Sequence, residues 1–172
     1  MIMKRVLAAL LPIAMLAVFN SSCSFSLNGA STVGLKTINV EYFENTSPLV
    51  VNYLSQQFTE SLKERIRSTT SLSIVQGEAT AHMSGSITGY AIEPISVQAT
   101  NSNTPPIAGA ERLTITVNVI YKNTVDKKLD FNQSFSEHQD FTGDISTQEQ
   151  KLITAINKQL TDDIFNRAFA NW

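Results

Sequence analysis

Cys23 has the clearest chemical role in this sequence, because it is the only cysteine and directly follows an apolar and small-polar stretch. Lys4 and Arg5 give the start of the chain a positive charge, and an apolar run covers residues 6–19. This order is typical of a secretory signal that ends in a lipoprotein-type cysteine. It predicts a signal peptide over residues 1–22, and acyl chains on Cys23 that anchor the protein to a membrane.

Two other interpretations of this segment have less support. A transmembrane helix needs about 20 apolar residues, whereas this run has 14. An ordinary signal peptide followed by an incidental cysteine would leave one thiol without a partner in an oxidising compartment. One detail departs from the usual pattern, since Asn20 stands where bacterial lipoproteins more often have a larger apolar residue.

Four basic residues are candidates for binding an anionic ligand: Arg112, Lys122, Lys127 and Lys128. The three lysines gather at one end of a predicted hairpin, and Arg112 lies near the opposite end of the same strand. Ammonium groups on a rigid hairpin can bind the phosphates of a lipid head group. The simpler alternative is that these lysines keep a turn soluble and protect a strand edge.

No residue pattern predicts catalysis, a metal site or a cofactor. His82 and His138 are the only histidines, and His82 has no ligand-type neighbour at metal-binding spacing. The chain has no G-x-S-x-G motif, no glycine-rich phosphate loop and no H-E-x-x-H motif. Asp162 and Asp163 are adjacent on a predicted helix, so their side chains diverge by about 100° and form no carboxylate pair.

The composition limits the class of partner. Residues 23–172 form a chain of 150 residues, which is enough for one domain with a hydrophobic core. Eleven basic and fifteen acidic residues give it a net charge of −4, so we expect no nucleic-acid partner. Charged residues are about 17% of this chain, against ~25% in a typical domain, whereas Ser, Thr, Asn and Gln number 54. Such a surface suits a polar, largely dehydrated contact such as a β-barrel lumen, although many exported proteins share this composition without such a partner.

The first half of the chain predicts a tether, a strand and a helix. Residues 23–34 are small and polar, as in a tether, and the alternation over residues 35–43 is typical of a strand. Ser47 as N-cap and Pro48 at the first helical position predict a helix that ends at Ser68.

Two further strands follow this helix. A short apolar run over residues 72–76 indicates one strand, and residues 81–97 indicate a long or bent one. Gly85 and Gly89 within the long strand predict a bulge or a close backbone approach. Residues 101–109 have the composition of a loop.

The second half predicts a hairpin and a final helix. Strict alternation over residues 113–121 is the clearest strand signal, residues 126–128 form the hairpin tip, and residues 131–139 form the return strand. The segment 146–149 fits a capping box for a helix that continues to Phe169.

These elements predict an α+β two-layer sandwich. We expect a mostly antiparallel sheet of about four strands, with two amphipathic helices packed on one face. A single domain would cover residues 35–172, and Trp172 could belong either to its core or to an interface.

Five segments in this order resemble the LptE family of lipopolysaccharide-assembly lipoproteins, in its Bacteroidota-type form. They are LKTINVEYFENTSPLVVNYLSQQFTESLKERI, ITGYAIEPISV, RLTITVNVIYKN, FNQSFSEHQDF and LTDDIFNRAFANW. The resemblance covers nearly the whole chain from Leu35 to Trp172, and none of the segments is a catalytic signature.

The resemblance implies a non-enzymatic lipoprotein anchored on the periplasmic side of the outer membrane. The family plugs the large LptD β-barrel, assists its assembly and helps to insert lipopolysaccharide into the outer leaflet. Family members bind lipopolysaccharide through basic residues that cannot be transferred to this chain one by one, so the four candidates come from hairpin position alone. The alternative function is a free outer-membrane lipoprotein that carries a hydrophobic ligand, with Phe131 and Phe135 lining its cavity.

Overall fold

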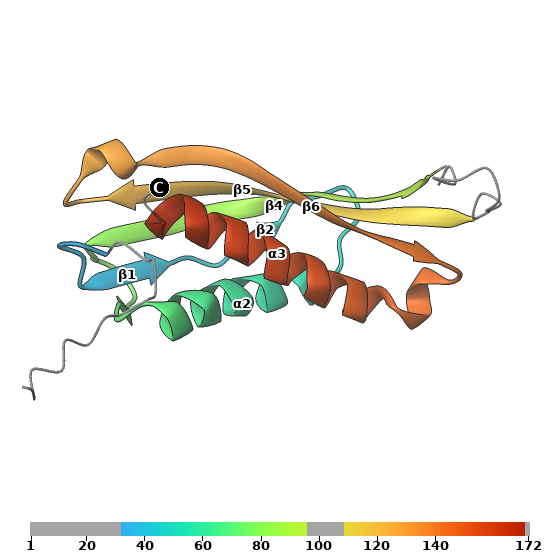
Figure 1. Cartoon of the computed structure of the whole chain (residues 1–172), viewed down its shortest axis with the longest axis horizontal. Coiled ribbons are helices and arrows are strands. Elements are labelled where there is room, and N and C mark those ends of the chain that lie inside the picture. Colours follow the sequence, from blue (N-terminus) through green and yellow to red (C-terminus); the bar gives the residue numbers. More distant parts are fainter. Residues whose placement is uncertain (1–31, 96–108, 171–172) are drawn as a thin grey trace, which may run out of the picture.

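The computed structural model describes residues 32–95 and 109–170, which form one sheet covered by two helices (Figure 1). Cys23, the signal peptide, most of the tether, most of the predicted loop and Trp172 lie outside the described residues. The elements are β1 (Thr37–Val40), β2 (Glu44–Asn45), α2 (Leu54–Thr69), β3 (Ser73–Ile74), β4 (Ala81–Pro94), β5 (Ala110–Asn123), β6 (Phe131–Thr142) and α3 (Glu149–Phe169).

The sheet has six strands and mixed direction, so the prediction of about four mostly antiparallel strands is wrong in detail. The strand order is β3-β1-β4-β5-β6, and β2 also pairs with β4. β1 runs parallel to β3 and β4, and β2 runs parallel to β4, whereas β4–β5 and β5–β6 are antiparallel. Five of the six strands overlap predicted segments, and only β2 was missed, because its two residues are too short to show alternation.

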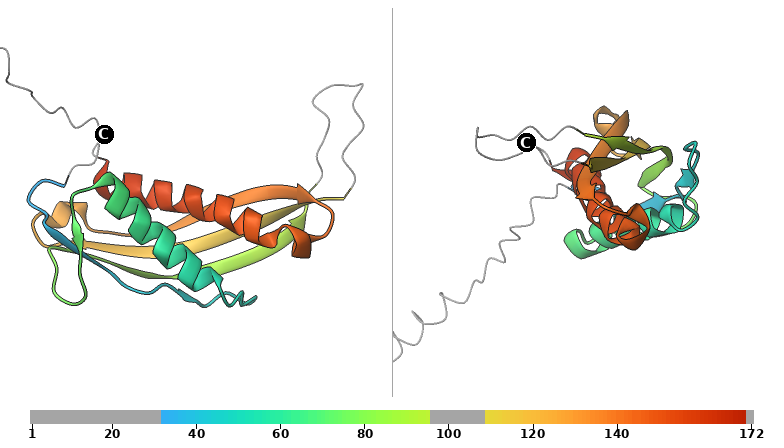
Figure 2. Two further views of the ribbon diagram at one scale, coloured as in Figure 1. Left: turned by 90° about the horizontal axis from the view of Figure 1, so that it is seen from below. Right: turned by 90° about the vertical axis from the view of Figure 1, so that its right-hand side faces the viewer.

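The two helices lie on one face of the sheet, which confirms the predicted α+β architecture (Figure 2). The odd-numbered apolar residues of β5 from Leu113 to Tyr121 are buried beneath them. Phe131 and Phe135 belong to this core, where the Phe131 ring lies 5.5 Å from that of Tyr121 and 6.2 Å from that of Phe135. Neither helix in the described ranges is long and apolar enough to span a bilayer.

Helix α2 begins at Leu54, so the prediction of a start at Pro48 is wrong. The buried Ser47 does not cap a helix, because its hydroxyl donates to the carbonyl of Leu49 at 2.7 Å and its N–H donates to Asn45 Oδ1 at 3.0 Å. These bonds hold a turn between β2 and the helix. The actual N-cap residue, Tyr53, makes no side-chain capping bond.

The predicted capping box at Ser146–Glu149 is also wrong. The N–H of Ser146 donates to Asp144 Oδ1 in a short 3₁₀ turn, at 2.9 Å. The Glu149 carboxylate instead accepts the hydroxyl of Tyr90 at 2.7 Å and that of Tyr53 at 3.0 Å. Burial, together with the bond and charge of Glu149, raises the pKa of Tyr90. Glu149 therefore ties the start of α3 to β4 and to the start of α2.

The two predicted features of the long strand are both present. The β4–β5 register shifts between Ile87 and Gly89, as expected for a bulge. At Gly85 the backbones approach so closely that a Cβ atom would lie far inside contact distance of the Asn118 carbonyl oxygen and 2.7 Å from Phe43 Cε1. Only glycine fits there without displacing the neighbouring strand or the Phe43 ring.

We expect Gly85→Ala to lower the free energy of unfolding by about 1–3 kcal/mol, because the added methyl group overpacks the contact between β4 and β5. Ser86→Ala, on the opposite face of the same strand, should change it by less than about 0.5 kcal/mol. Urea denaturation followed by circular dichroism measures both. Equal stability of the two variants would contradict this account of Gly85.

Candidate functional site

The hairpin between β5 and β6 brings three of the four candidate basic residues together. Lys127 and Lys128 lie in a 3₁₀ turn, and Lys122 is near the end of β5. Asp126 Oδ1 accepts the N–H of Lys128 at 3.0 Å and so holds the turn. Among the residues that the structure describes, Lys127 and Lys128 form no ion pair. Both are exposed and can meet an anion in solution.

Asp130 organises the base of this hairpin. Its Oδ1 accepts the N–H of Asn123 at 2.7 Å, and its Oδ2 lies 3.3 Å from Lys122 Nζ. The backbone bond from Asn123 is the largest cause of the lowered pKa of Asp130, and Lys122 adds to it. Lys122 is therefore partly neutralised at rest, and the charge of Lys127 also lowers the pKa of Asp130, although Lys127 does not pair with it directly.

Arg112 does not belong to this cluster. It lies ten residues before Lys122 on an extended strand, a separation of about 33 Å. Its guanidinium forms a two-bond ion pair with Asp140 across the β5–β6 pairing, at 2.6 and 3.0 Å. This pair lowers the pKa of Asp140 and raises that of Arg112. Arg112 and the three lysines are thus at opposite ends of the sheet.

Arg167 is a basic residue at the hairpin end that sequence reasoning missed. Its guanidinium lies 4.7 Å from the centre of the Phe131 ring, at the start of β6. Such a contact between a cation and an aromatic ring is attractive. The 35 residues between Phe131 and Arg167 hide this proximity, and no local signal in the sequence would have indicated it.

The chain enters the domain at the same end. A Cβ atom on Gly34 would lie 2.9 Å from Val125 Cγ1, so the backbone before β1 runs directly beside the hairpin. Cys23 precedes Gly34 by eleven residues, which bounds its distance from the hairpin end at about 40 Å. The three lysines are therefore within reach of the surface to which an acylated Cys23 would be anchored.

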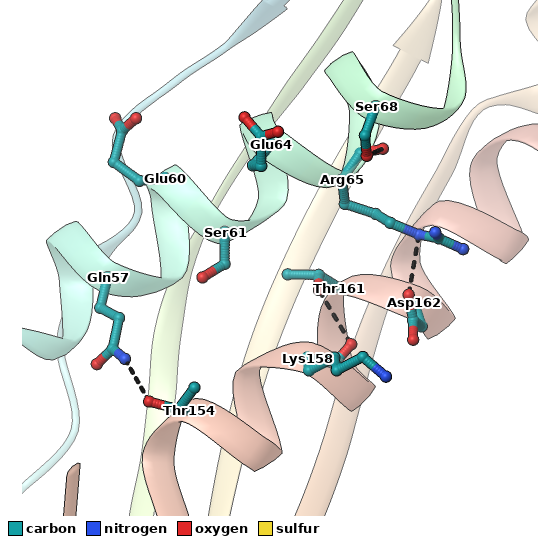
Figure 3. Close-up of a pocket in the computed structure, with 10 residues that line it drawn as sticks. All are labelled: Gln57, Glu60, Ser61, Glu64, Arg65, Ser68, Thr154, Lys158, Thr161 and Asp162. Carbon is teal, nitrogen blue, oxygen red and sulfur yellow. Dashed lines mark hydrogen bonds and ion pairs between the residues drawn. The ribbon is translucent and has the colours of Figure 1, made fainter. Parts of the chain in front are cut away.

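A polar groove of about 520 Å³ runs between α2 and α3 (Figure 3). Gln57 Nε2 donates to Thr154 Oγ1 at 2.8 Å across it, and Arg65 Nε pairs with Asp162 Oδ1 at 2.9 Å. Glu60, Glu64 and Lys158 also line the groove, which is open to solvent. An open groove of this kind would leave much of a hydrophobic ligand exposed to water.

The two histidines lie on the sheet beside the basic candidates: His82 is directly opposite Lys122, and His138 is near the Arg112–Asp140 pair. His82 Nε2 is 3.0 Å from the carbonyl oxygen of Ala79, and His138 is exposed on β6. Within residues 32–95 and 109–170, no three His, Cys, Asp or Glu side chains are grouped as a metal ion would require.

A family model described as "LptE: Lipopolysaccharide-assembly" matches residues 35–168. The chain belongs to the LptE family. A search of curated proteins found no match. The LptE resemblance of the five sequence segments is therefore confirmed by a match that spans nearly the whole described domain.

Two solved structures with TM-scores above 0.5 show the same fold at low sequence identity. The hypothetical protein CT253 from Chlamydia trachomatis superposes with a TM-score of 0.54 at 9% identity, covering 80% of this chain and 99% of that one. Protein XCC0632 from Xanthomonas campestris also has a TM-score of 0.54 at 9% identity, covering 79% and 84%. Rare lipoprotein B from Shewanella oneidensis has a TM-score of 0.45 at 12% identity, covering 74% and 91%. The first two indicate a shared fold and say nothing of function.

We expect the amide resonance of Asn123 to titrate with a midpoint below pH 3.8, because its acceptor Asp130 has a lowered pKa in the folded protein. The contribution of this carboxylate to stability is present above pH 3.8 and is lost as the pH falls through the lowered pKa. NMR spectra recorded from pH 6 to pH 2 measure this midpoint. Asp130→Asn keeps an acceptor oxygen but removes the titrating group, so its Asn123 resonance should not show this step. A midpoint at or above 3.8 would contradict the assignment.

Proposed function

We propose that this LptE-family protein is an outer-membrane lipoprotein that acts in lipopolysaccharide assembly without catalysing a reaction. It is anchored through acylated Cys23, faces the periplasm, plugs an LptD-type β-barrel and assists the assembly of that barrel. It also helps to insert lipopolysaccharide into the outer leaflet. The observation that carries this proposal is the family match over residues 35–168.

The signal segment and the domain geometry support the anchored orientation. Residues 1–22 have the pattern of a lipoprotein signal, and the chain reaches β1 beside the hairpin. The hairpin lysines and Arg167 would then be on the membrane side of the domain. Their cations could bind the phosphates of lipopolysaccharide there. Arg112 lies at the far end of the sheet, so it would not contact the same phosphates as the hairpin lysines.

The low charge of the chain supports a place inside a barrel. Only 16% of its residues are charged, and charged groups are costly to bury in a contact unless each finds a partner. Ser, Thr, Asn and Gln can exchange water for hydrogen bonds with a polar wall at lower cost. No observation on the described residues favours the alternative of a hydrophobic-ligand carrier, because Phe131 and Phe135 pack in the core and the groove between the helices is open to solvent.

Affinity purification of the native acylated protein in detergent, with a high-salt wash and mass spectrometry, tests the partner. We expect a large outer-membrane β-barrel to be recovered at about one copy per copy of this protein. Recovery of the folded, acylated protein alone would refute the proposal that it plugs a barrel and would favour the alternative of a free hydrophobic-ligand carrier.

We expect the triple variant Lys122→Ala, Lys127→Ala, Lys128→Ala to bind lipopolysaccharide roughly tenfold more weakly, because three exposed ion contacts contribute about 0.5 kcal/mol each. Equilibrium binding to purified lipopolysaccharide at fixed salt measures this loss. The matched control, Lys63→Ala, Lys151→Ala, Lys158→Ala, removes the same charge from the helices and should bind within twofold of the wild type. Unchanged binding of the hairpin variant would refute the site assignment.

A further inference from the structure

The face of the sheet that the helices leave open is organised in rows across β4, β5 and β6. In antiparallel pairs, residues directly opposite each other point to the same side. The row at the hairpin end contains His82 and Lys122, and a row at the far end contains Glu93, Arg112 and Asp140. Three successive rows between these ends contain no ionisable side chain. We call these nine residues the polar strip: Ser84, Ile120 and Asn132; Ser86, Asn118 and Ser134; Gly89, Thr116 and Ser136.

The polar strip and the helices differ sharply in charge, although charged residues border the strip at both ends and Glu44 of β2 lies opposite Ser86. Helices α2 and α3 together contain eleven Asp, Glu, Lys or Arg residues, and the polar strip contains none. A sheet face in contact only with water is expected to carry charged side chains, because these favour solubility. This division indicates that the helix side faces water and that the strip faces something uncharged.

Most polar side chains of the strip have hydrogen-bonding capacity to spare. Thr116 and Ser136 bond to each other at 3.0 Å. Within the part of the chain that the structure describes, the side chains of the other five polar members make no hydrogen bond. Their hydroxyl and amide groups are therefore available to a partner.

The outer edge of β6 extends this capacity to the backbone. The N–H of Ile95 donates to the carbonyl of Ala110, so even-numbered residues of β5 face β4 and odd-numbered ones face β6. The β5–β6 register continues without a shift, so the even-numbered residues of β6 direct their N–H and C=O groups outward. The carbonyl of Thr142 fits this pattern, because it accepts a bond from Gln148 Nε2.

This edge lacks the usual protection against pairing. Edge strands are commonly blocked by proline, by a bulge, by charges or by very short length. β6 is twelve residues long, pairs with β5 without a bulge, and has no proline or charged residue between Phe131 and Ser136. The first half of β6 can therefore hydrogen-bond to another polypeptide along its edge.

We propose that the polar strip, with the outward edge of β6 from Asn132 to Ser136, is the surface that packs against the uncharged polar inner wall of the barrel partner. This proposal rests on the proposed function. A surface of small hydroxyl and amide groups matches a polar β-sheet wall in charge and in hydrogen bonding. The charged helices are left toward the aqueous side.

Introducing charge into the strip tests this assignment. The double variant Asn132→Lys, Ser134→Lys adds two cations at exposed positions that make no side-chain bond in the described residues. The matched control Gln56→Lys, Gln150→Lys adds the same charge at exposed positions on α2 and α3. Affinity purification of the acylated protein, with the recovered barrel quantified by mass spectrometry, should show at least a tenfold loss for the strip variant and less than a twofold change for the control.

Photocrosslinking supplies a readout that does not depend on the folding of a lysine variant. A benzophenone amino acid at Ser134 should crosslink to the barrel, and the same group at Gln56 should not. Two results would overturn the strip assignment and leave the proposed function standing. In one, the wild type recovers the barrel and the two lysines in the strip do not reduce this recovery. In the other, Ser134 crosslinks only to a second copy of this chain. If the wild type recovers no barrel, the proposed function is overturned and the strip assignment with it.

Discussion

The antiparallel pairing of β5 with β4 and β6 is the constraint on which the rest of this structure depends. Along β5, every second residue from Leu113 to Tyr121 points toward the helices and is buried, and the residues between them point to the open face. A shift of one residue in either register would exchange the two faces and expose the core. Gly85 permits the close approach of β4 to β5. The bulge before Gly89 adds one residue to β4, so that Tyr90 points toward the core as Ile87 does.

Helix α3 is held at both ends by contacts that the sheet supplies. At its start, Glu149 accepts hydroxyls from Tyr53 and Tyr90. Near its end, the Phe169 ring packs 5.8 Å from that of Tyr121, close to the point where the hairpin leaves the sheet. The basic turn therefore projects from a packed aromatic cluster, which limits its freedom to move relative to the sheet. Because the turn is already held in place, binding an anion requires less ordering of its backbone, which lowers the entropic cost of binding.

Patterns of burial in this chain could be predicted from the sequence, whereas contacts between distant segments could not. The alternation from Leu113 to Tyr121 and the nearness of Lys127 to Lys122 follow from local spacing. Ser47 and Glu149 satisfy local capping rules, but each makes a tertiary or turn bond that the rules do not consider. The pairing of Arg112 with Asp140 depends on strand register, and the approach of Arg167 to Phe131 depends on how α3 crosses the sheet, so neither could be derived from spacing.

The two proposed surfaces make opposite physical demands, and the fold separates them. Cations such as Lys127 and Lys128 must remain hydrated until an anionic ligand replaces the water, so they belong at an end of the molecule that is exposed to solvent. A contact with a barrel wall must exclude water, so it needs uncharged side chains whose dehydration is offset by hydrogen bonds to the wall, such as those of Ser134 and Asn118. Because β5 is extended, it carries the strip along its length and the hairpin at its tip, and both surfaces can be occupied at once.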